Sequence, residues 1–175
     1  SKIASKAFVS RPSAGRFFEI LEDTLIVRRC PAFAGTERQR LIQHPKFYFF
    51  DCGVWNGLLK NFETSLDRIG GLFETFIYNQ LCDVLNAKGE VYRISFYRTE
   101  HGAEVDFILE KDGTTYAIET KATQNIGRND LKGFQSFAHF YPKKFKSMVI
   151  YMGNAEKVID NVDILPWEKA LNALM

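Results

Sequence analysis

Three side chains that can hold a metal ion and act on a phosphate lie close together in mid-chain: Asp106, Glu119 and Lys121. Glu119 and Lys121 are two residues apart in a β-prone run, so both point to the same face of a strand. Asp106 lies in the preceding β-prone run and can project into the same space. Two carboxylates can bind Mg²⁺ or Mn²⁺, and a lysine beside a bound water can stabilise charge on a phosphodiester under attack. The alternative left open by spacing alone is a set of cross-strand ion pairs on a solvated sheet face.

The elements that must position these residues follow from turn signals and periodicity. Asp112-Gly113 between the two runs predicts a tight β-hairpin. Apolar residues recur with the period of a helix after Gly70-Gly71 and again before Phe140. The predicted elements besides the hairpin are a helix over 72–85, a strand over 91–97, a helix over 129–140 and a strand over 147–152.

Glu74 is a further acid of interest, because it lies in the first turn predicted for the helix over 72–85. An acid there can contribute an oxygen to a metal site on the neighbouring sheet. It can equally serve to complement the helix dipole. The sequence leaves both roles open.

The order helix, strand, hairpin, helix, strand, with these residues in it, resembles the PD-(D/E)XK or restriction-endonuclease-like superfamily. The resemblance implies an α/β fold, with a mixed sheet flanked by helices. It implies a divalent ion, Mg²⁺ or Mn²⁺, as the cofactor. By the same resemblance, the acids and the lysine of the site are Asp106, Glu119, Lys121 and Glu74.

Three details complete that resemblance. With the carboxylates, we expect the carbonyl of Thr120 to be a metal ligand. Gln135 falls where one branch of the superfamily carries a glutamine that belongs to the site, and Tyr141 is a candidate partner for it. The chain departs from the name-giving pattern at Val105, which stands in place of the proline.

A closer resemblance covers nearly the whole chain. The phrase over 45–54 and the Gly-x-x-x-Glu helix start that ends in Glu74 resemble a nuclease-like domain found C-terminal to AAA+ ATPase modules in bacteria and archaea. The resemblance implies an AAA+ module as partner. The sequence contains no Gly-x-x-x-x-Gly-Lys-Ser/Thr phosphate loop, so ATP is expected only through an ATPase module N-terminal to these residues.

The N-terminal segment predicts a separate small module over 1–45, before the nuclease-like domain over 46–175. Ser10 is a good helix N-cap and Pro12 suits a first helical turn. A short helix, a turn and this capped helix resemble the helix-turn-helix part of a winged helix, although Phe8 stands where glycine is usual. The residues that such a helix would present to DNA are Arg11, Ser13 and Arg16. The alternative is a linker module that touches no bases.

Charge gives further support to nucleic acid as a partner. Residues 1–48 carry nine lysines and arginines against four acids, whereas the chain as a whole has a net charge of only +2. The basic residues that can follow a phosphate backbone are Arg28, Arg29, Arg38, Arg40 and Lys46. We therefore expect DNA as the partner, although a basic solvated surface accounts for the same charges.

Composition predicts a cytoplasmic protein without a membrane partner. No apolar run approaches the roughly 20 residues that span a bilayer, and the three widely spaced cysteines match neither a zinc site nor a disulfide framework. Three function classes remain open: a metal-dependent nuclease acting on DNA, a catalytically inactive module of that fold that binds DNA or a partner, and a structural oligomerisation domain.

Overall fold

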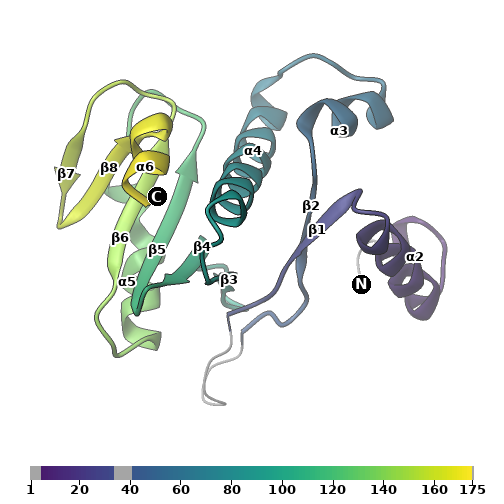
Figure 1. Ribbon diagram of the computed structural model, residues 1–175, viewed down its shortest axis with the longest axis horizontal. Coiled ribbons are helices and arrows are strands. Elements are labelled where there is room, and N and C mark those ends of the chain that lie inside the picture. The colour runs from purple at the N-terminus through teal and green to yellow at the C-terminus, as the bar shows by residue number, and fades with distance from the viewer. Residues whose placement is uncertain (1–4, 34–40, 175) are drawn as a thin grey trace.

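The computed structural model describes residues 5–33 and 41–174, which form two sheets and the helices around them (Figure 1). A two-stranded sheet pairs β1 (Val27–Cys30) with β2 (Lys46–Phe49), and a six-stranded sheet has the order β3-β4-β5-β6-β8-β7. Its strands are β3 (Tyr92–Arg98), β4 (Glu104–Lys111), β5 (Thr114–Lys121), β6 (Lys146–Tyr151), β7 (Lys157–Ile159) and β8 (Val162–Pro166). The predicted mixed sheet flanked by helices is confirmed, since β4 and β5 are antiparallel and β5 and β6 parallel.

The predicted hairpin is present, with Asp112 and Gly113 alone between β4 and β5. Both turn residues have positive φ, 50° and 71°, as a type I′ turn requires. The register runs from Lys111 opposite Thr114 to Phe107 opposite Ile118. The hairpin therefore fixes which residues of the two strands face each other.

On the other side of β4, its pairing with β3 is irregular beside Asp106. Three steps along β4, from Val105 to Ile108, match two steps along β3, from Ser95 to Tyr97. One extra residue on β4 is the signature of a β-bulge, which redirects side chains and occurs often next to functional sites.

Helix α4 (Leu66–Ala87) covers one face of the large sheet and packs between β5 and β2 (Figure 1). It begins before Gly70 and Gly71, so the expectation that this pair opens the helix is wrong. A glycine costs about 1 kcal/mol inside a helix but does not end it. At Gly71 the helix passes close to Trp55, where a Cβ would lie 3.3 Å from the indole ring.

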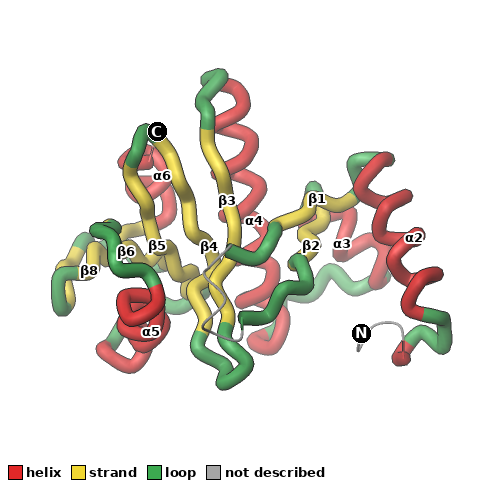
Figure 2. The backbone as a smooth tube through the Cα atoms, turned by 90° about the horizontal axis from the view of Figure 1, so that it is seen from below, coloured by secondary structure: helices red, strands yellow, loops and turns green. Residues whose placement is uncertain are grey.

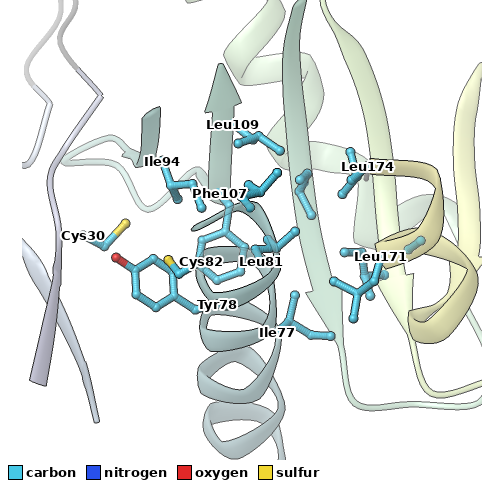
Figure 3. Packing of buried hydrophobic residues seen from close by; sticks show 14 of the residues in the cluster. Cys30, Ile77, Tyr78, Leu81, Cys82, Ile94, Phe107, Leu109, Leu171 and Leu174 are labelled. Carbon is cyan, nitrogen blue, oxygen red and sulfur yellow. The ribbon is translucent and has the colours of Figure 1, made fainter. Parts of the chain in front are cut away.

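The core between α4 and the sheet is built from large apolar side chains (Figure 3). Ile77 and Leu81 of α4 face Phe107 and Ile118 of the hairpin, and all four are at most 2% exposed. Helix α6 (Trp167–Leu174), which begins after Pro166, closes this core with Leu171.

The opposite face of the sheet is covered by η1 (Arg128–Leu131) and α5 (Lys132–Phe140), seen below the strands in Figure 2. Phe134 and Phe137 pack there against Ile108 and Ala117. Because successive strand residues point to opposite faces, the hairpin supplies Phe107 and Ile118 to one core and their neighbours to the other.

The N-terminal part begins with α2 (Arg11–Asp23), whose cap Ser10 accepts a hydrogen bond from the Ser13 amide. It continues with β1 (Val27–Cys30), β2 (Lys46–Phe49) and α3 (Cys52–Leu59). The sequence predicted a module boundary after residue 45. Strand β1 lies before this boundary and β2 directly after it, and the two strands pair with each other. Among the described residues, no helix is both long and apolar enough to cross a bilayer.

We expect the close packing of α5 on β4 to require a glycine at position 133. A Cβ at this position would press into the backbone carbonyl of Glu104, with its carbonyl carbon only 3.1 Å away. We expect Gly133→Ala to lower the free energy of unfolding by about 1–3 kcal/mol, the usual cost of overpacking, measured by thermal or urea unfolding.

The matched control is Gly70→Ala in α4, where a Cβ meets nothing within 4 Å. This variant should gain about 0.5–1 kcal/mol from helix propensity. Equal stability of Gly133→Ala and wild type would contradict the close approach of α5 to β4.

Candidate functional site

The carboxylate of Asp106 is buried at the bulge in β4 and is held by β5. Its Oδ2 accepts two hydrogen bonds of 2.8 Å, from the backbone amide and the hydroxyl of Thr120. The residue is 8% exposed. Extending the pairing of Phe107 with Ile118 by one residue places Asp106 opposite Glu119. The hairpin therefore brings the two predicted metal acids together.

Glu119 and Lys121 point to the same side of β5, as their spacing predicts. The ammonium of Lys121 donates to Oε1 of Glu119 at 2.7 Å. The other carboxylate oxygen, Oε2, is buried and has no hydrogen-bond partner among the described residues. An oxygen in this state lacks the donor or cation that a buried carboxylate normally has.

Burial and a neighbouring negative charge disfavour the charged form of each acid. Burial raises the pKa of Glu119 to about 8, with the charge of Asp106 as the second cause. Burial likewise raises the pKa of Asp106, with Glu74 adding to the effect and Lys46 opposing it. Burial lowers the pKa of Lys121, but Glu119, Asp106 and Asp130 together leave it above its ordinary value. A cation bound between the acids would relieve the repulsion.

Lys46 enters the site from β2, which the sequence did not predict. Its ammonium lies 2.9 Å from Oε1 of Glu74, 2.6 Å from Oε1 of Glu104 and 3.9 Å from Oδ1 of Asp106. Tyr48, two residues further along the same strand, donates a hydrogen bond of 2.5 Å to Glu74. Lys46 was expected to contact a phosphate backbone, whereas in the structure its ammonium is paired with carboxylates.

The donor set fits one hydrated divalent ion. Asp106 and Glu119 supply two carboxylates, and Mg²⁺ is usually bound by one or two carboxylates with water completing its shell. Within residues 5–33 and 41–174, no group of three or more His, Cys, Asp or Glu side chains is arranged to hold a metal. Glu74 is engaged by Lys46 and Tyr48, and its role as a ligand stays a prediction, as does that of the Thr120 carbonyl.

Gln135 does not join these acids in the structure. It is exposed on α5 and lines a hollow of about 420 Å³ together with Ser147 and Asp163. Its candidate partner Tyr141 hydrogen-bonds instead to Thr115, at 3.0 Å.

The predicted nucleic-acid residues lie on α2, at the opposite end of the molecule from β7 and β8 (Figure 1). Arg11, Ser13 and Arg16 are all exposed. The Ser13 hydroxyl is hydrogen-bonded to the Ser10 hydroxyl at 2.8 Å, within the helix cap.

Of the other basic residues, Arg28 pairs with Asp83 at 2.6 Å. Arg29 lies over the ring of Phe47. Arg38 and Arg40 lie outside the described residues.

The raised pKa of Glu119 predicts a pH-dependent stability of the divalent-free chain. The folded state keeps the proton up to about pH 8, whereas the ordinary pKa is 4.5. Stability therefore falls as pH rises through this window, by at most about 1.4 kcal/mol per pH unit. Glu119→Gln does not titrate, so it should unfold at a higher temperature than wild type near pH 8 and at a similar one near pH 5, measured in EDTA.

Glu63→Gln is the control for this measurement, because Glu63 is an exposed loop residue. Its unfolding profile should follow that of wild type at every pH. A Glu119→Gln profile parallel to wild type would show that Glu119 is charged throughout the window.

Comparison with known proteins places the chain in a family. Uncharacterized proteins of Mycobacterium bovis and Mycobacterium tuberculosis are each 30% identical to it over 127 residues, which are 70% of this chain and 28% of theirs. The chain thus spans less than a third of the length of these relatives.

Among solved structures, a chain in the refined half-complex from a tetradecameric assembly of Thermococcus gammatolerans McrB AAA+ hexamers with bound McrC has a TM-score of 0.42 to this chain. The sequence identity is 13%, over 61% of this chain and 33% of the other. A likeness of this extent establishes no shared function.

Two family descriptions match the sequence itself. Residues 1–65 match a domain of unknown function, DUF8612. Residues 69–170, more than half of the chain and the part that carries Glu74, Asp106, Glu119 and Lys121, match a second domain of unknown function. The chain belongs to this second family, DUF4143.

Proposed function

We propose that the chain carries a metal-dependent nuclease site of the PD-(D/E)XK type on a restriction-endonuclease-like sheet. The observation that carries the proposal is the convergence of Asp106 and the Glu119–Lys121 pair at the end of one hairpin, with Oε2 of Glu119 buried and unpartnered. The reaction class is hydrolysis of a phosphodiester, with DNA as the substrate.

The mechanism assigns a separate task to each residue. A divalent ion bound by Asp106 and Glu119 would lower the pKa of a coordinated water and offset charge on the phosphate. Thr120 holds Asp106 through two hydrogen bonds, which fixes one carboxylate before substrate arrives. Lys121 has a raised pKa, so it stays charged and can donate to the oxygen on which negative charge develops.

The same proposal includes an AAA+ ATPase as the partner module, with ATP bound there and not in these residues. The support is the sequence resemblance over 45–54 and around Glu74, together with relatives that extend far beyond the matched part. In such an arrangement the exposed residues of α2, Arg11, Ser13 and Arg16, face nucleic acid.

One observation favours a second candidate, a catalytically inactive module of the same fold that binds DNA or a partner. Lys46 already places a positive charge among Glu74, Glu104 and Asp106. A structure that balances its buried acids internally can persist without a metal. Metal binding and cleavage separate this candidate from the nuclease.

Asp106→Ala should abolish tight Mn²⁺ binding, because it removes one of two carboxylates. Calorimetric titration of the 175-residue chain with Mn²⁺ measures this directly. The matched control is Asp163→Ala, which removes an exposed aspartate on β8 and should leave the affinity unchanged. Equal Mn²⁺ binding by Asp106→Ala and wild type would rule out Asp106 as a ligand.

Lys121→Ala should reduce the rate of DNA cleavage by about 10²–10³, the usual cost of losing one donor to developing charge. Mn²⁺ affinity should change little, because the ammonium ligates no metal. The assay is Mg²⁺- or Mn²⁺-dependent cleavage of single- and double-stranded DNA. Lys169→Ala is the control, since Lys169 pairs with Glu156, outside the site.

A chain that cuts neither DNA form with any divalent ion, even when joined to its ATPase module, would rule out the nuclease and leave a catalytically inactive module of this fold. Cleavage that survives Lys121→Ala undiminished would contradict the role given to this lysine.

A further inference from the structure

Lys46 occupies an unusual position for a lysine, because carboxylates from two other elements surround its ammonium. Glu74 approaches from α4, and Glu104 and Asp106 approach from β4. The two nearest oxygens, on Glu104 and Glu74, lie at 2.6 Å and 2.9 Å, within hydrogen-bonding range. The lysine side chain is 21% exposed.

The ammonium is fixed in this position by the strand that carries it. Cys30 of β1 pairs with Lys46 of β2. Tyr48 of β2 donates to the same Glu74 oxygen that accepts from Lys46. The ring of Phe96 lies 5.3 Å from the ammonium, a distance at which the aromatic face attracts a cation.

Asp106 connects the lysine to the proposed metal site. Its Oδ1 faces Lys46 at 3.9 Å, whereas its Oδ2 is bound to Thr120, the neighbour of Glu119. In nucleases with two metals the ions lie roughly 3.5–4 Å apart and act on one substrate phosphate. Here Oδ1 of Asp106 faces the Lys46 ammonium, and Oδ2 faces β5, the strand that carries Glu119.

The charge balance of the region favours one divalent ion over two. The acids of this region are Glu74, Glu104, Asp106 and Glu119, and the cations paired with them are Lys46, Lys121 and Arg98. The set carries one net negative charge when all groups are ionised. One divalent ion turns this into a single positive charge, and a second would add two more charges in a buried region.

We propose that the ammonium of Lys46 stands where a second divalent ion would otherwise bind, so that the site takes one divalent ion per chain. The inference rests on the proposed function and goes beyond it by fixing the number of metals. Lys46 is a positioning residue: its ammonium holds Glu74 and Glu104 and faces Asp106, in the place that a second ion would take.

The test counts Mn²⁺ ions by calorimetry and follows their spacing by electron paramagnetic resonance. The wild-type chain should bind one Mn²⁺ with the spectrum of an isolated ion. Lys46→Met keeps an unbranched side chain, one atom shorter, but removes its charge, so the three acids should admit a second Mn²⁺. The expected result is a doubled stoichiometry and the spectrum of a magnetically coupled pair.

Two control variants are measured beside Lys46→Met. Lys46→Arg keeps the positive charge and should bind one Mn²⁺, as wild type does. Lys111→Met removes a lysine at the far end of β4, where it pairs with Glu90 and Asp112, and should also bind one. Neither control should show a coupled pair.

Two tight Mn²⁺ ions in the wild-type chain would overturn the inference without any variant, even if Lys46→Met failed to fold. One ion in wild type and one of unchanged affinity in folded Lys46→Met would overturn it too, while leaving the proposed function standing. No Mn²⁺ binding by either chain would remove the proposed metal site and the inference together.

Discussion

The buried carboxylate of Asp106 is the group on which the rest of the site depends. It has little exposure to water, and a carboxylate in that state needs donors or cations around it. Thr120 provides two hydrogen bonds from β5, and Lys46 provides a positive charge from β2. The surroundings of Asp106 therefore depend on the bulge in β4, on the register of the hairpin and on the position of β2.

The sequence predicted the parts of this arrangement that depend on local rules. Asp112-Gly113 specifies its own turn, and a two-residue turn sets the register of the hairpin. Glu119 and Lys121 share a face because strand side chains alternate. The start of α4 was placed too late because glycine weakens a helix without ending it, and packing beside Trp55 was invisible in the sequence.

Lys46 could not be assigned from the sequence because its partners are distant along the chain. Glu74 is 28 residues away, and no periodicity connects a two-stranded sheet with a helix and a hairpin. The one available signal was the alternation of Lys46 and Tyr48 on β2, which places both on one face. Gln135 illustrates the converse, since its place on α5 was predicted but its exposed position beside Ser147 and Asp163 depends on packing.

The site also draws on both matched segments. Lys46 and Tyr48 belong to residues 1–65, whereas Glu74, Glu104 and Asp106 belong to residues 69–170. The order of these groups along the chain has a consequence for biosynthesis, which runs from the N-terminus at about 5–20 residues per second. Lys46 leaves the ribosome seconds before the last of its acids, so the counter-charge is already available when the carboxylates become buried.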